Sequence, residues 1–135
     1  MAFSLGGSSY RQMRLLGLDV PPRTKNGEPI DSEQEAINRV VWSCYIIDVI
    51  LASGVDKNSS FRGDFPDLPL PCSNVEFLSS IDCRPPSLPH VLETPGVIQT
   101  LDLPALSAVL IHLREFLRTT RNISYGFTDA DLRRR

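Results

Sequence analysis

The segment from Ser32 to Ser53 constrains the fold more than any other part of the chain. Its apolar residues recur at intervals of three and four, which places them along one side of an α-helix: Ile37, Val40, Val41, Cys44, Ile47 and Leu51. Four more apolar residues occupy much of the opposite side: Trp42, Ile46, Val49 and Ile50. A helix that is apolar nearly all round belongs in the centre of a larger helical assembly. We therefore expect this helix in the middle of the fold, starting at a capping box of Ser32 and Glu35.

A second long helix is expected from Asp102 to about Asn122, because Pro104 is harmless in a first turn and Asn122 is a natural stop. Its predicted apolar face contains Leu103, Leu106, Val109, Leu110, Leu113, Phe116 and Leu117. A shorter helix is expected over residues 8–18, with Tyr10, Met13 and Leu16 on one side. Gly17 suits the left-handed position that ends a helix, and Leu18 suits the hydrophobic contact that closes it.

Residues 55–95 have the opposite character. Six prolines lie between Pro66 and Pro89, and proline is excluded from helix interiors and central strands. The run from Leu68 to Cys72 is therefore expected to be extended, with one short helix after it, opened by Ser73 and Glu76. The predicted fold class is all-α: an irregular helical domain or fragment with two long apolar helices and a proline-rich connecting segment.

Charge and cysteine content narrow the function. The net charge of −2 gives the chain no electrostatic attraction to nucleic acid or to an anionic membrane. Its longest apolar stretch is interrupted by Asp48 and is shorter than the roughly 20 residues of a membrane span. Cys44, Cys72 and Cys83 are odd in number and widely spaced, so they predict neither a disulfide framework nor a zinc site. We expect an intracellular protein that is not secreted and contains no metal or other cofactor.

The polar residues do not form a catalytic motif. Cys44 lies in the middle of an apolar helix, where a small inert hydrophobic residue is the ordinary interpretation. His90 and His112 do not complete a triad, a phosphate loop or a metal motif with the cysteines. Three arginines, Arg114, Arg118 and Arg121, follow one flank of the second long helix and are expected to complement its C-terminal dipole. The sequence therefore predicts a regulatory or interaction module and not an enzyme.

The segment from Asn38 to Asp48 resembles the signature helix of the fungal-specific transcription factor domain, the middle homology region of fungal zinc-cluster transcription factors. Five residues occupy the matching positions: Arg39, Trp42, Ser43, Tyr45 and Asp48. Residues 10–19, which end in Leu-Gly-Leu-Asp, resemble the preceding block of that family, and residues 67–72, Asp-Leu-Pro-Leu-Pro-Cys, resemble a following one. The resemblance covers residues 10–78, and residues 96–135 have only a general helical pattern.

The chain departs from this family at some positions. Val49 follows Asp48 where a basic residue is usual, and the six-cysteine zinc cluster that binds DNA in full-length members is absent. The resemblance therefore implies zinc and DNA binding only for a parent protein. It implies a nuclear, effector-sensing regulatory region, partnered by the rest of that parent or by a second copy, with a small-molecule effector whose binding residues are unknown. The alternative is a free-standing helical protein–protein interaction module that does not bind DNA.

Two structural expectations follow. Asp48 should be buried and should contact either an arginine, with Arg11, Arg14 and Arg62 as candidates, or backbone amides of another element, because buried charges are paired. Arg39 lies on the other side of the helix from Asp48 and is not its partner. Residues 1–135 are expected to be a single partial domain that does not behave as a clean monomer, because the side with Trp42, Ile46, Val49 and Ile50 lacks cover.

Overall fold

The computed structural model describes the chain except residues 1, 21–28, 53–59, 62–63, 80–82 and 133–135, and except the side chains of residues 2–6 and 122–132. The elements are α1 (Ala2–Leu15), α2 (Ser32–Ala52), α3 (Asn74–Leu78), α4 (Leu88–Glu93), the 3₁₀ helix η2 (Pro95–Thr100) and α5 (Leu103–Leu132). Extended pairing among the described residues consists of two isolated antiparallel bridges, Ile30 with Cys83 and Pro69 with Ser87. The all-α fold class is confirmed. None of the described helices is both long enough and apolar enough to cross a membrane.

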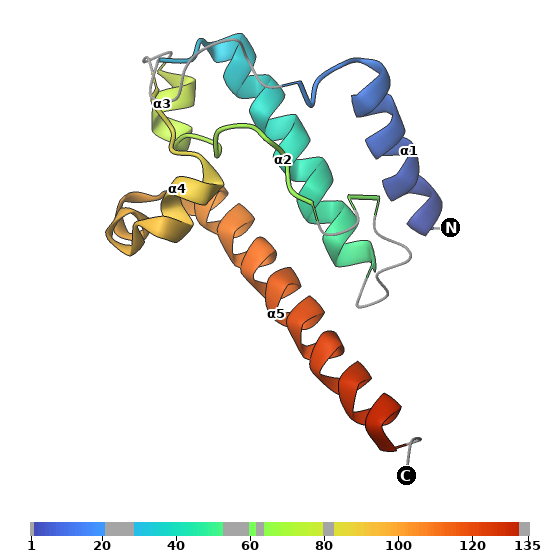
Figure 1. Ribbon diagram of the computed structural model, residues 1–135. Helices are drawn as coiled ribbons and strands as arrows, with labels where there is room; N and C mark the ends of the chain where they lie inside the picture. The colour runs from blue at the N-terminus through green and yellow to red at the C-terminus, as the bar shows by residue number, and fades with distance from the viewer. Residues whose placement is uncertain (1, 21–28, 53–59, 62–63, 80–82, 133–135) are drawn as a thin grey trace.

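Helix α2 is the centre of the arrangement (Figure 1). Helix α1 lies along it on one side and α5 contacts it on another. The short helices α3 and α4 lie near the N-terminal ends of α2 and α5, and the C-terminal half of α5 extends beyond the other helices (Figure 1). The main hydrophobic core is formed by α2 and its neighbours, and a second, small cluster contains Ile30, Cys72 and Cys83.

Helix α1 ends as expected. Gly17 has a φ of 65°, in the left-handed region. Its amide donates to the carbonyl of Arg14 at 3.1 Å, and the Leu18 amide donates to the carbonyl of Met13 at 3.1 Å. These are the two hydrogen bonds of a Schellman motif, in which the residue after the glycine also packs on the helix. Leu18 packs against the core that contains the buried Met13. The helix starts earlier than predicted, at Ala2, and Leu16 is exposed rather than on the buried side.

The capping residue predicted for α2 was wrong. Asp31, and not Ser32, caps the helix: its Oδ1 accepts from the Gln34 amide at 2.8 Å, and its carbonyl accepts from the Glu35 amide at 3.0 Å. The Glu35 side chain does not turn back to the helix start, because its carboxylate binds elsewhere in the fold. The predicted capping box of Ser73 and Glu76 at the start of α3 is confirmed.

The buried face of α2 differs from both predicted faces. Val40, Ile47 and Ile50 are exposed, although the sequence pattern places the first two on the main stripe. Trp42 and Val49 are buried, although they were expected to lack cover. The reason is that the proline-rich segment contributes to the core: Leu68, Leu70 and Cys72 are buried within it. A helix with apolar residues all round has several possible core faces, and the segment that packs on it selects one.

Two elements of the proline-rich region were missed. Residues 88–93 form α4 and residues 95–100 form η2, and each has a proline in its first turn. Proline has no backbone N–H, but the N–H groups of the first helical turn have no partner within the helix, so nothing is lost there. Its fixed φ also suits a helix start. Proline density predicts an interruption of helical structure, whereas Pro89 and Pro95 each lie at the start of a helix.

Helix α5 packs through small residues. Ala105, Ala108 and Val109 are buried, because short side chains allow another element to approach the helix closely. Of the predicted apolar face, Leu103, Leu110, Phe116 and Leu117 are exposed, so that face was largely wrong. The helix also continues past Asn122 to Leu132. Arg114, Arg118 and Arg121 therefore lie in its middle and cannot complement its C-terminal dipole, and Arg118 forms an ion pair with Glu115.

Candidate functional site

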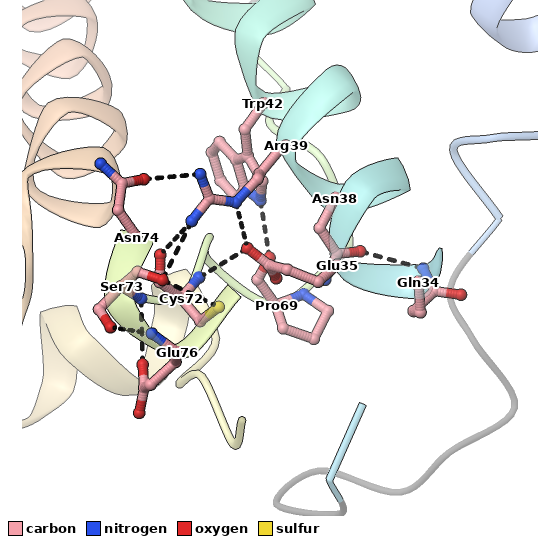
Figure 2. A network of polar contacts seen from close by, with 10 residues as sticks. All are labelled: Gln34, Glu35, Asn38, Arg39, Trp42, Pro69, Cys72, Ser73, Asn74 and Glu76. Atoms are coloured by element: carbon pink, nitrogen blue, oxygen red, sulfur yellow. Dashed lines mark hydrogen bonds and ion pairs between the residues drawn. The ribbon is translucent and has the colours of Figure 1, made fainter. Parts of the chain in front are cut away.

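The polar side chains of α2 converge on the extended residues 69–73 and the start of α3, and Figure 2 shows this network from close by. Glu35, Arg39 and Trp42 project from successive turns of one face of the helix. Each of them bonds to the backbone of the extended segment. The network therefore joins two parts of the chain that are about thirty residues apart in sequence.

Glu35 is the buried charge of this network, with a relative exposure of 0%. Its Oε1 accepts two hydrogen bonds, from the Cys72 amide at 2.9 Å and from Arg39 Nε at 2.8 Å. The second oxygen, Oε2, has no hydrogen-bond partner among the described residues. A buried carboxylate is stable only when it is paired, and Arg39 and the Cys72 amide provide its partners.

Arg39 uses its remaining donors on the loop that leads into α3. Nη1 donates to Asn74 Oδ1 at 2.8 Å, and Nη2 donates to the carbonyls of Cys72 at 2.9 Å and Ser73 at 3.2 Å. The guanidinium group also lies 4.4 Å from the centroid of the Phe77 ring, within the range of a cation–π contact. The planar fork of arginine makes these contacts simultaneously, which lysine cannot do.

Trp42 connects the network with the core. It is 1% exposed, and its indole Nε1 donates to the carbonyl of Pro69 at 2.8 Å. Its ring meets Tyr45 edge to face, with the ring centroids 5.7 Å apart. Of the five signature residues, Ser43 is exposed on α2 and lies outside this network.

Tyr45 links α2 to α5. Its hydroxyl lies 3.3 Å from His112 Nδ1, and its ring meets Phe61 edge to face at 5.2 Å. Burial, with a contribution from the Glu115 carboxylate, raises the pKa of Tyr45 to about 12, so its hydroxyl keeps its proton at neutral pH. Burial lowers the pKa of His112, and the opposing effect of Glu115 is smaller.

The state of His112 predicts a pH dependence. Because its pKa is lower in the folded chain than in the unfolded chain, acidification through the ordinary histidine range adds a proton to the unfolded state first. Stability should therefore fall as the pH drops below about 6.5, with a slope of at most about 1.4 kcal/mol per pH unit from this group. Urea unfolding at several pH values measures it. His112→Gln should reduce the slope, whereas His90→Gln, at an exposed histidine, should leave it unchanged. Equal slopes in all three proteins would contradict the prediction.

Asp48 is buried, with 4% relative exposure, as the sequence predicted. Its Oδ2 accepts from the Ser60 amide at 2.8 Å and from the Phe61 amide at 3.4 Å, so backbone amides of another element contact it. Of the candidate arginines, Arg14 pairs with Asp19, and Arg62 lies outside the described residues. Asp48 therefore fixes the segment that places Phe61 against Tyr10 and Tyr45.

Replacing Asp48 with leucine should destabilise the chain by about 3 kcal/mol. The substitution leaves the buried Phe61 amide and the part-buried Ser60 amide without their acceptor, and an unsatisfied buried donor costs about 1–3 kcal/mol. Asp48→Asn keeps an oxygen at this position and should cost less than half as much. Chemical unfolding followed by circular dichroism provides both values. If the two variants were equally stable, the carboxylate would not be anchoring residues 60–61.

Two residues of the site were missed in the sequence. Glu35 was assigned to a cap, and Asn38 was given no role, yet both are fully buried. Asn38 Oδ1 accepts from Gln34 Nε2 at 3.0 Å. The available signal was the spacing of four residues between Glu35 and Arg39, which places an acid and a base together on one helix face.

The described part of the chain contains a groove beside the network and another beside α1. One, of about 420 Å³, passes Cys72, Glu76, Arg84 and Asp102. The other, of about 450 Å³, lies between α1 and the residues after α2, and it is lined by Tyr10, Met13, Arg14, Asp19, Phe61, Asp64, Phe65, Pro66, Asp67 and Pro89. Cys44, which the sequence suggests is inert, is half-buried, and burial raises the pKa of its thiol.

The comparisons with known proteins identify a family for this chain. A family model described as the fungal specific transcription factor domain matches residues 9–127, which include α2, the proline-rich segment and most of α5. No curated protein and no solved structure matches the chain. The match extends well past the region of residues 10–78 in which the sequence motifs resemble that family. This chain belongs to the family of fungal-specific transcription factor domains.

Proposed function

We propose that this chain is the effector-responsive regulatory region of a nuclear fungal transcription factor and acts on transcription through a DNA-binding domain elsewhere in the parent protein. The observation that carries the proposal is the family match over residues 9–127. The net charge of −2 favours action through a protein partner over direct contact with nucleic acid. The proposed role is regulatory and not enzymatic.

The signature residues fit a scaffold role within this proposal. Arg39 and Trp42 bond to the extended segment, Tyr45 contacts α5, and Asp48 holds residues 60–61. Their polar groups point into the fold and bond to other parts of the same chain. We assign these four residues to the internal frame of the domain, and Ser43, which is exposed, to no part of it.

The groove beside α1 is the place we propose for a small-molecule effector. Three aromatic rings line it, from Tyr10, Phe61 and Phe65, together with the carboxylates of Asp64 and Asp67. Ligand sites are typically apolar with a few polar groups that fix orientation. These walls suit a compound with an apolar body and a cationic group. Because Asp48 anchors Phe61 to α2, an occupant would act on the position of α1 relative to α2.

A reporter assay tests the proposed function. The full chain is fused to an unrelated DNA-binding domain, and transcription from that domain's site is compared with transcription from the domain alone. The fusion is expected to change the output, Trp42→Ala should abolish the change, and Ser43→Ala, an exposed position on the same helix, should preserve it. An output equal to that of the DNA-binding domain alone would contradict the proposal, as would a salt-resistant, sequence-specific gel shift by the unfused chain.

The alternative, an interaction module, is favoured by one observation. Large apolar side chains are exposed on α2 and α5: Val40, Ile47, Ile50, Leu103, Leu110, Phe116 and Leu117. Large exposed apolar patches are rare on monomers and usually mark a partner site. It lies on a different part of α2 from the Trp42 side that the sequence suggested. Either the rest of a parent protein or a second copy of the chain would cover it.

We expect the purified chain to self-associate or to bind a dye that reports exposed apolar surface. Light scattering and dye fluorescence are the measurements. Leu110→Glu together with Leu117→Glu, on the exposed side of α5, should shift the chain toward the monomer without lowering its stability, because neither side chain is in the core. A monodisperse wild-type monomer that does not bind the dye would rule out this interpretation of the surface.

A further inference from the structure

We propose that Glu35, Cys72 and Cys83 form a binding site for a single thiophilic divalent metal ion, with zinc as the expected occupant. One carboxylate oxygen and the two sulfur atoms all lie within 4.8 Å of one another, and all three residues are buried. Zinc bonds of about 2.3 Å to sulfur and 2.0–2.2 Å to oxygen place tetrahedral ligands roughly 3.5–3.8 Å apart. From separations of at most 4.8 Å, the ligands need to close by no more than about 1.0–1.3 Å.

The fold holds the three ligands on separate elements. Glu35 is in the first turns of α2, Cys72 ends the extended segment, and Cys83 is fixed by an antiparallel bridge in which the Ile30 amide donates to its carbonyl at 3.0 Å. Ile30 and Phe77 pack around the cysteines and keep the site apolar. Ten residues separate the two cysteines in the sequence, and this spacing matches no zinc motif. The sequence alone therefore predicts a chain without metal. This proposal departs from that expectation.

The Glu35 carboxylate supplies a second, independent observation. Its Oε1 is saturated by the Cys72 amide and Arg39, while Oε2 is buried and has no hydrogen-bond partner among the described residues. A buried, unpaired oxygen in a native structure calls for an explanation such as an ion. One carboxylate oxygen of Glu35 and the two cysteine sulfur atoms give a set of three ligands with the oxygen and sulfur chemistry that zinc accepts.

The charges also balance. Two thiolates and one carboxylate carry three negative charges, and a divalent ion with the Arg39 guanidinium carries three positive charges. With the thiols protonated and no ion bound, the Glu35 carboxylate and the Arg39 guanidinium remain as a neutral ion pair. The site therefore has no net buried charge in either state, and metal binding must release the thiol protons. Cys72 lines the 420 Å³ groove, which offers the ion an entry path and leaves the fourth coordination position to water.

Cobalt and zinc titrations of the reduced full chain test the proposal. Cobalt should bind with a stoichiometry of one and produce thiolate-to-metal charge-transfer absorption together with the strong visible bands of tetrahedral cobalt, which zinc should then remove. Cys72→Ser and Cys83→Ser should each weaken binding by about 100-fold or more, since even changes to residues behind the ligands cost 10–100-fold. Glu35→Gln should weaken it by at least about tenfold. The matched control is Cys44→Ser, at a half-buried cysteine away from the site, which should bind as the wild type does.

A second measurement does not depend on how the variants fold. In the wild-type chain, zinc should protect Cys72 and Cys83 from alkylation, read by mass spectrometry, and should leave the rate at Cys44 unchanged. The proposal is overturned if cobalt gives no thiolate band, or if the serine variants bind as tightly as the wild type, which would indicate an adventitious ion only. Protection that results from a Cys72–Cys83 disulfide without metal uptake would overturn it as well.

Discussion

Replacing Trp42 with alanine should destabilise the chain by about 4 kcal/mol, the typical cost of truncating a large buried aromatic residue. Trp42 is 1% exposed, and its indole donates to Pro69, so the substitution leaves a cavity and also an unpaired carbonyl. Urea unfolding followed by circular dichroism measures the loss. Complete unfolding of the variant would also agree with the prediction, because a loss of about 4 kcal/mol is a large part of the stability of a small domain.

The matched substitution is Trp42→Phe. It keeps most of the ring and removes the indole N–H, so it should cost about 1–2 kcal/mol for the lost hydrogen bond and a small change in packing. Glu35 and Arg39 would still hold residues 72–74 in that variant. If alanine and phenylalanine at this position gave the same small loss, Trp42 would not be a central part of the core.

Replacing Arg39 with alanine should cost about 3–5 kcal/mol, because it leaves the fully buried Glu35 carboxylate without its counter-charge. The variant also loses the bonds to Asn74 and to the carbonyls of Cys72 and Ser73. The measurement is again urea unfolding at neutral pH.

Two controls separate the buried pair from charge in general. Arg14→Ala breaks the exposed ion pair with Asp19 and should cost no more than about 1 kcal/mol. The double variant Glu35→Leu, Arg39→Met should be more stable than Arg39→Ala, because no uncompensated buried charge remains. Equal losses for Arg39→Ala and Arg14→Ala would show that Glu35 does not depend on Arg39.

The helices of this chain were predictable where local chemistry decides. Gly17 ends α1 because glycine, which lacks a Cβ atom, adopts a positive φ without steric cost. Ser73 and Glu76 start α3 with the predicted reciprocal hydrogen bonds. The burial of Asp48 followed from its place on an apolar helix, and its partners proved to be amides of residues 60 and 61.

The faces of the helices were not predictable in the same way. Helix α2 is apolar all round, so its sequence has no single stripe that fixes which side is buried, and the extended residues 68–72 select the Trp42 side. Helix α5 buries alanines and exposes leucines, the reverse of what hydrophobicity alone suggests. These outcomes depend on tertiary contacts between distant segments, which periodicity within one segment does not contain.

The site shows the same limit. The resemblance to a family motif identifies Arg39 and Trp42, but it does not identify their backbone partners, which are the carbonyls of Pro69, Cys72 and Ser73. Cys72 and Cys83 lie apart in sequence and come together with Glu35 through tertiary contacts, which include the bridges between Ile30 and Cys83 and between Pro69 and Ser87. The sequence reveals such a cluster only when the ligands belong to one short motif with fixed spacing, as in zinc fingers.

The central claim is that the polar side chains of α2 hold the extended proline-rich segment as an integral part of the domain. Native-state hydrogen exchange of two backbone amides tests it directly: Cys72, which donates to Glu35, and Leu70, which donates to the carbonyl of Pro86. Amides that open only with the whole fold exchange at the rate set by global unfolding. We expect both to exchange as slowly as the amides in the middle of α2. Rapid exchange of Leu70 and Cys72 while α2 remains protected would show that the segment detaches on its own, and would contradict the scaffold role assigned to Glu35, Arg39 and Trp42.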